Sequence, residues 1–186
     1  DAEELVKMLA YLMHDNAGPV AVRFPKKEFA PFDLKAAIKS VRTKKYNPFS
    51  AERLADGSQV LILSEGVFAE KALAARKILA GSKISAEVID VKAVHPLPMP
   101  QLLRALKGKK LLATIENHGA TGGLADLVSK QLREHGVQIH HEAFAFPDEV
   151  VPHGVIADIE AACGLSPEAI AKRIIRGLKS LRKPKP

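Results

Sequence analysis

Residues 90–98 read Asp90-Val91-Lys92-Ala93-Val94-His95-Pro96-Leu97-Pro98. Further along, the chain reads Ile115-Glu116-Asn117-His118 and then Gly122-Gly123-Leu124-Ala125-Asp126-Leu127-Val128. Each piece is typical of a buried strand that runs out into a loop opening a helix. Domains of the α/β class place ligands and partners at loops of this kind. These stretches therefore predict an α/β fold, with its polar loops at one edge of the sheet.

The sequence around these stretches alternates regularly between apolar strand patterns and helical patterns. Single helices between successive strands imply parallel pairing with right-handed crossovers, and hence a three-layer α/β/α sandwich. A last helix is predicted over 166–181, with Ser166 as its N-cap. We expect strands over 59–63, 85–91, 110–116 and 138–143, and further helices over 67–79, 99–107, 122–135 and 153–163.

One additional strand is predicted at the edge of the sheet, over residues 49–54. Asp56-Gly57 follows it, and this dipeptide between two strands is typical of a tight hairpin. We therefore expect this strand to pair antiparallel with the strand over 59–63. The sheet would then be mixed but mostly parallel.

The first residues do not make a domain of their own. Apolar spacing predicts a helix over 3–14, and a short strand over 19–25 ends at its proline. Residues 34–38 show only a weak helical pattern within a basic stretch. We interpret residues 1–27 as the last helix and strand of a preceding domain, 28–49 as a basic interdomain linker, and 50–186 as the main domain with a basic tail.

The composition of the 186 residues is that of a soluble globular protein, with 47% hydrophobic and 26% charged residues. There is neither a long apolar run nor a signal-peptide pattern, so we expect a cytoplasmic protein without a membrane segment. Cys163 is the single cysteine, expected as a small buried residue at a helix end. Because the chain begins at Asp1 rather than Met, we expect a processed product or a piece of a longer polypeptide.

The net charge of +7 is concentrated in two places. Residues 23–45 contain eight basic residues against two acids, and residues 172–186 add seven basic residues with no acid. Such runs bind phosphates in some proteins but are more often solvated surface. Aromatic residues are few and there is no Trp, so base stacking, and with it nucleic-acid binding, is not expected.

Candidate functional residues lie in three loops. Glu116 and His118 follow a strand and His153 lies in a turn; we interpret all three as loop or interface residues in preference to acid–base catalysts. Arg23 and Lys26 flank a proline and form the best phosphate-binding candidates. The histidines lack the spacing of a metal site, and His140 and His141 should face opposite sides of a strand. No catalytic residue is predicted.

The order of these motifs resembles the C-terminal domain of the transketolase superfamily, the thiamine-diphosphate enzymes. Gly18-Pro19 followed by Arg23-Phe24-Pro25-Lys26 is similar to the family's Gly-Pro-x-x-x-Arg-Tyr-Pro-Arg-Gly segment. Residues 88–98 resemble its Val-x-Asp-x-Arg-x-Val-Lys-Pro-Leu-Asp. Residues 115–123 resemble its Glu-Glu-x followed by Gly-Gly. Residues 146–154 and 164–166 are most similar to the deoxyxylulose-phosphate synthase branch.

The resemblance implies a reaction in which thiamine diphosphate takes up pyruvate, CO2 leaves, and the carbanion equivalent adds to glyceraldehyde 3-phosphate. It also implies that Arg23 and Lys26 contact the acceptor's phosphate, although lysine replaces the family's second arginine and cannot form a bidentate fork. Lys27 and Ala125 replace family glycines. The Gly-Asp-Gly motif for diphosphate and Mg2+ and the helix bearing the activating glutamate are absent from the sequence.

This interpretation predicts a polypeptide that binds no cofactor and is inactive alone, and that works with the remaining thiamine-diphosphate-binding domains in an enzyme that is a homodimer. Two alternatives stay open. One is the small subunit of a split transketolase, or the β subunit of a 2-oxo-acid dehydrogenase. The other is a free-standing module that binds polyanions through the basic linker and tail.

Overall fold

The computed structural model spans residues 1–186 and describes residues 1–14, 18–19, 21–22, 24–25, 32–43 and 46–181. The chain divides into two compact units, Asp1–Pro48 and Phe49–Pro186. Among the described residues, no helix has the length and apolar character needed to cross a membrane. The assignment of residues 1–27 to a preceding domain and of 28–49 to a linker stays a prediction.

The first unit contains two helices, α1 (Ala2–His14) and α2 (Leu34–Thr43). Asp1 and Asp33 cap them, because each carboxylate accepts a backbone N–H three residues later, from Glu4 at 2.8 Å and from Ala36 at 3.0 Å. The helix predicted over 3–14 is confirmed, and α2 is longer than the weak pattern suggested. The strand predicted over 19–25 is wrong for the part that the structure describes, since no residue there is in a strand.

The second unit is built on one sheet of five strands in the order β1-β3-β2-β4-β5. Strands β2, β3, β4 and β5 are parallel, and β1 is antiparallel to β3. The mixed, mostly parallel sheet is confirmed. The strands are β1 (Ala51–Ala55), β2 (Val60–Ser64), β3 (Ala86–Val91), β4 (Leu111–Gly119) and β5 (His140–Phe146).

The predicted hairpin between the first two strands is wrong. Strand β1 pairs with β3, with Glu52 opposite Asp90, and does not pair with β2. Both edges of β2 are already occupied by the parallel strands β3 and β4, so β1 cannot pair with β2 and pairs instead with the outer edge of β3. Gly57 is needed for a different reason: a Cβ there would come within 2.1 Å of the Ala86 carbonyl carbon.

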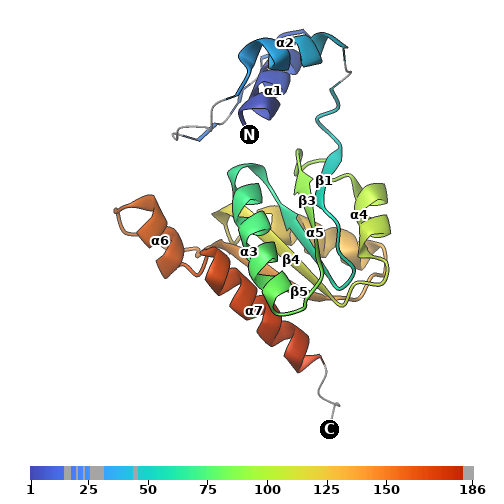
Figure 1. The fold of residues 1–186 in the computed structure, drawn as a ribbon, viewed down its shortest axis with the longest axis vertical. Helices are drawn as coiled ribbons and strands as arrows, with labels where there is room; N and C mark the ends of the chain where they lie inside the picture. The colour runs from blue at the N-terminus through green and yellow to red at the C-terminus, as the bar shows by residue number, and fades with distance from the viewer. Residues whose placement is uncertain (15–17, 20, 23, 26–31, 44–45, 182–186) are drawn as a thin grey trace. The chain divides into compact units, whose positions relative to one another are not determined.

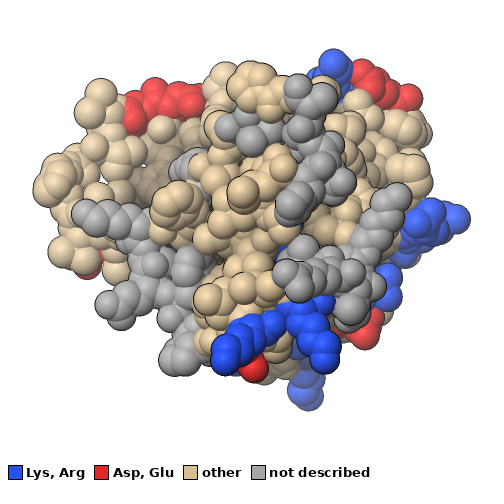
Figure 2. Space-filling view, turned by 90° about the horizontal axis from the view of Figure 1, so that it is seen from above, with Lys and Arg blue, Asp and Glu red and all other residues tan. Residues whose placement is uncertain are grey.

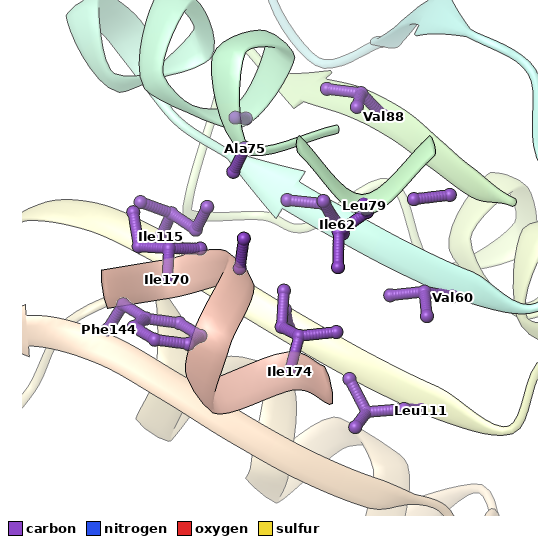
Figure 3. Packing of buried hydrophobic residues seen from close by; sticks show 14 of the residues in the cluster. Val60, Ile62, Ala75, Leu79, Val88, Leu111, Ile115, Phe144, Ile170 and Ile174 are labelled. Carbon is purple, nitrogen blue, oxygen red and sulfur yellow. The ribbon is translucent and has the colours of Figure 1, made fainter. Parts of the chain in front are cut away.

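Helices cover both faces of the sheet, which confirms the three-layer sandwich (Figure 1). Helices α3 (Ala69–Gly81) and α7 (Pro167–Ser180) pack on one face through Leu79 and Ile174 (Figure 3). Helices α4 (Met99–Leu106) and α5 (Leu124–Glu134) pack on the other through Leu102 and Val128. The short elements are η1 (Gly66–Phe68) and α6 (Ile156–Ala162).

Two helix-end predictions can be compared directly with the structure. The Ser166 hydroxyl accepts the Ala169 N–H at 3.2 Å, which confirms the N-cap of α7. Cys163 is the C-terminal cap residue of α6, as predicted, but it is only partly buried.

Candidate functional site

The strand order reverses its direction between the neighbouring strands β2 and β4. From β2 the chain passes through α3 to β3, which lies on one side of this pair, and from β4 it passes through α5 to β5, which lies on the other side. We name the carboxyl ends of β2 and β4 the crevice position. Folds of this kind bind ligands outside the carboxyl ends of two such neighbouring strands. Here these ends carry Ser64-Glu65-Gly66 and Glu116-Asn117, so the position is lined by acidic side chains.

Glu116 is fully buried at this position and binds the N-terminus of α5. Its two carboxylate oxygens accept the backbone N–H groups of Leu124 at 2.5 Å and Ala125 at 3.0 Å. The first N–H groups of a helix have no partner within the helix and attract negative charge. A side chain of this protein therefore occupies the place where an anionic ligand would bind.

The glycine before α5 makes room for that carboxylate. A Cβ at Gly123 would lie 1.9 Å from Glu116 Oε2, so no other residue fits there without moving the buried side chain. The preceding Gly122 has φ of 76°, in the left-handed region, and its N–H donates to Asp126 Oδ2 at 2.7 Å. Gly122 is thus required by the left-handed backbone turn, and Gly123 by the close approach of the Glu116 carboxylate.

The pKa of Glu116 is raised from its usual value of 4.5. Burial of the carboxylate is the main cause, the hydrogen bonds from Ala125 and Leu124 act in the opposite direction, and the nearby charge of Glu65 raises the pKa further. A carboxylate saturated by backbone donors and shielded from solvent is poorly placed to exchange protons with a substrate. The arrangement supports a structural role for Glu116.

His118 is exposed near the end of β4, and its Nδ1 is 3.0 Å from the Gly119 carbonyl oxygen. The loop that follows β4 is fastened to the segment after β5. Thr121 donates its hydroxyl to Asp148 Oδ2 at 2.5 Å and its N–H to Oδ1 at 3.1 Å, and these bonds lower the pKa of Asp148. The structure therefore brings the carboxyl end of β4, with Glu116 and His118, together with the Pro147-Asp148 segment.

The other predicted residues are not brought into this cluster. His153 is exposed and forms no hydrogen bond or ion pair with the described part of the chain. Arg23 and Lys26 lie outside the described residues, so their role in phosphate binding stays a prediction.

A hydrogen-bond network around His141 of β5, which is partly buried, was not predicted. His141 Nε2 lies 2.9 Å from Thr114 Oγ1 on β4, and its Nδ1 lies 3.0 Å from Ser129 Oγ on α5. Burial lowers the pKa of His141 to about 4, with the charges of His140 and Arg173 adding to the effect and Glu142 opposing it. The ring is therefore neutral at pH 7 and connects three elements as donor and acceptor.

His140 faces the other side, as the alternation along the strand predicted. Its Nε2 lies 2.9 Å from Glu142 Oε1, and Arg173 Nε of α7 donates to Oε2 at 2.6 Å. Burial acts to raise the pKa of Glu142, but the hydrogen bonds from His140 and Arg173 outweigh it, so the pKa is lowered. The cluster fixes α7 on the sheet at Gly177, where a Cβ would lie 3.0 Å from His140 Nε2.

The described residues do not fit a metal–diphosphate site. They contain no group of three or more His, Cys, Asp or Glu side chains placed to hold a metal ion. The crevice position is acidic, and its helix N-terminus is already bound by Glu116, so a diphosphate would meet repulsion there. In the part of the chain that the structure describes, these residues hold the carboxyl ends of β4 and β5 and the start of α5 together.

Residues 50–170 match the family described as "Transketolase, C-terminal domain". Among curated proteins, the chain is 32% identical over 188 residues to the 1-deoxy-D-xylulose-5-phosphate synthase of Pelotomaculum thermopropionicum, which covers 100% of this chain and 28% of that protein. It is 29% identical over 167 residues to the synthase of Syntrophotalea carbinolica, covering 90% of this chain and 25% of that protein. The chain thus spans about a quarter of these relatives.

Solved structures share the fold. A split-gene transketolase, described as an inactive β4 tetramer, is 24% identical with a TM-score of 0.69, over 75% of this chain and 46% of that chain. A transketolase mutant from Pichia stipitis in complex with fructose 6-phosphate is 20% identical with a TM-score of 0.55, over 71% of this chain and 18% of that chain. Both likenesses concern the sandwich fold.

Proposed function

The chain belongs to the transketolase C-terminal domain family, and from this premise we propose that it is the C-terminal part of a thiamine-diphosphate enzyme of the 1-deoxy-D-xylulose-5-phosphate synthase type. The whole enzyme would join pyruvate and glyceraldehyde 3-phosphate with loss of CO2. In this proposal the chain is inactive alone, stabilises a dimer of the enzyme, and lends the cations Arg23 and Lys26 to the substrate phosphate.

The observation that carries this proposal is the full-length match to the synthases, which extends beyond the 50–170 domain to both ends of the chain. A match confined to the domain would fit any member of the superfamily. A small subunit of a split transketolase is less well supported, because the likeness to a split-gene transketolase, at 24% identity, concerns the fold alone.

The site geometry agrees with a domain that assists catalysis from outside the reacting centre. Glu116 is bound by two backbone N–H groups and His141 by two hydroxyls, so neither side chain is available to a substrate. Thiamine diphosphate and Mg2+ would supply the carbanion chemistry in the complete enzyme. In our proposal the other domains hold both groups.

Reconstitution tests the proposal. The purified chain and the thiamine-diphosphate-binding portion of the same enzyme are produced separately, and formation of deoxyxylulose phosphate from pyruvate and glyceraldehyde 3-phosphate is followed by mass spectrometry. We expect no product from either part and product from the mixture. Carbon–carbon ligation by the chain alone would overturn the proposal, as would a mixture that stays inactive while the uncut enzyme turns over.

A further inference from the structure

The segment between β5 and α7 carries an apolar face that no described residue covers. Its members are Val150, Val155 and Ile156, with exposed fractions of 95%, 67% and 67%; we name them the 150–156 face. Helix α6, to which Ile156 belongs, has no buried residue. Val155 is the N-cap of this helix, and Val150 lies in the loop before it. Exposed apolar side chains concentrated in one short segment are a feature of surfaces that bind another protein.

The helix is nevertheless held in place from its inner side. Lys71 of α3 lies 2.6 Å from Glu160 Oε2, and Ile159 contacts the position of Gly154. A helix of seven residues is too short to be stable without such contacts. A groove of about 340 Å3 lies beside it, lined by Phe146, Pro147, Ala162, Cys163 and three alanines. The helix is therefore tied to α3 by an ion pair, and its C-terminal end borders a groove.

The segment itself contributes Asp and Glu side chains but no Lys or Arg, and the nearby Lys71 of α3 is paired with Glu160. There is no Lys or Arg between Arg133 and Lys172, although the whole chain has a net charge of +7. Asp148, Glu149 and Asp158 are exposed within this region. An acidic rim disfavours nucleic acid and anionic lipid. It also disfavours the same face of a second copy, because like charges would meet across the two-fold axis.

We propose that the 150–156 face docks the thiamine-diphosphate-binding portion of the same enzyme, through an apolar surface rimmed by Lys and Arg. This inference rests on the proposed function. The curated relatives carry about three quarters of their length outside the region matched by this chain, so a large partner surface is available in them. Only a cationic rim complements the acidic one, and the apolar centre supplies the binding free energy.

Binding of the purified chain to the separately produced thiamine-diphosphate-binding portion is measured by calorimetry. The test variant is V155S/I156S, and the control is Ile78→Ser, which changes a comparably branched, exposed residue on α3. A second test variant, Glu149→Lys, reverses one charge of the rim. We expect V155S/I156S to weaken binding about tenfold or more, Glu149→Lys to weaken it less and mainly at low salt, and the control to bind as the parent chain does. Thermal melts verify that each variant folds, and if V155S/I156S does not fold, Glu149→Lys decides.

The outcomes separate the two claims. If the parent chain binds and the test variants bind equally well, the 150–156 face is wrong and the proposed function stands. If the parent chain neither binds nor restores activity, the proposed function fails and the inference with it. If the chain alone self-associates in sedimentation and V155S/I156S abolishes this, a second copy is the occupant and the inference is overturned.

Discussion

The carboxylate of Glu116 fills the space that a side chain at Gly123 would need: a Cβ there would lie 1.9 Å from Oε2. The relationship couples the end of β4 to the start of α5. We expect Gly123→Ala to displace Glu116 from the N–H groups of Leu124 and Ala125 and to lower the free energy of unfolding by about 3 kcal/mol. Urea denaturation measures it. Gly81→Ala, in open space, is the control, and an equal loss there would contradict this explanation.

His141 predicts how stability depends on pH. Its folded pKa of about 4 lies below its usual value of 6.5, so the unfolded chain binds the proton more readily between these values. The contribution of His141 to stability is complete above pH 6.5 and is lost as the pH falls toward 4, by about 3 kcal/mol in all. We expect His141→Gln to remove this part of the pH dependence in urea titrations. His135→Gln, at an exposed histidine, should leave it unchanged.

The ion pair of Lys109 and Glu87 is buried on both sides. Lys109 Nζ lies 2.6 Å from Glu87 Oε2, and the side chains are 7% and 5% exposed. Arg53 Nε lies 2.8 Å from Oε1, without the alignment of a hydrogen bond. We expect Lys109→Met to cost about 3 to 5 kcal/mol of unfolding free energy, because the buried carboxylate loses its main partner. K109M/E87L should recover most of it, and a double variant as unstable as the single one would contradict the pairing.

Asp148 fastens the loop after β4 to the segment after β5, so its removal should loosen the loop without unfolding the sheet. We expect Asp148→Ala to accelerate hydrogen exchange of the Thr121 amide, while Glu149→Ala does not. Because the folded pKa of Asp148 lies below 3.8, the fastening is complete above that pH and is lost as the pH falls through the folded value. Exchange that stays slow in Asp148→Ala would mean that Thr121 is held by something else.

Lys26 is predicted to contact the phosphate of the acceptor substrate in the complete enzyme. We expect Lys26→Gln to raise the KM for glyceraldehyde 3-phosphate about tenfold with little change in the KM for pyruvate, because one charge-assisted bond to phosphate is lost. Lys26→Arg should bind the phosphate at least as well as lysine does. Equal effects on both substrates would argue against a phosphate contact.

Most of the sandwich could be predicted from the sequence, because its central parallel strands are short, nearly continuous apolar runs and its helices follow an apolar periodicity of 3.6 residues. The pairing of β1 could not. Asp56-Gly57 favours a hairpin locally, but β2 has parallel strands on both edges and the glycine is used for the close approach to Ala86. Which strand edges remain unpaired depends on the order of all strands in the sheet, so a local sequence pattern cannot predict it.

The roles of the side chains at the site also depend on contacts that a local sequence pattern does not predict. Glu116 and the Gly-Gly pair could be found as a motif, but a polar residue after a strand is compatible with catalysis, binding or support. The two backbone hydrogen bonds of Glu116 distinguish these roles, and they depend on how α5 is placed. The hydrogen-bond network around His141 was missed because Thr114 and Ser129 are distant from it in sequence. His141 shares its face of β5 with Ala143 and Ala145, and an ionisable residue on that otherwise apolar face was the signal that could have found it.

Glu116 also determines whether free anions can bind at the N-terminus of α5. A carboxylate tethered beside the N-terminus of α5 acts as a ligand at an effective concentration on the order of millimolar or more. Free phosphate at ordinary cellular levels would have to displace it, and would then lie next to Glu65. The Glu116 carboxylate therefore competes with free anions at the place where related sheets bind them. We expect the loop between β4 and α5 to keep the same conformation at low and at high concentrations of phosphorylated metabolites.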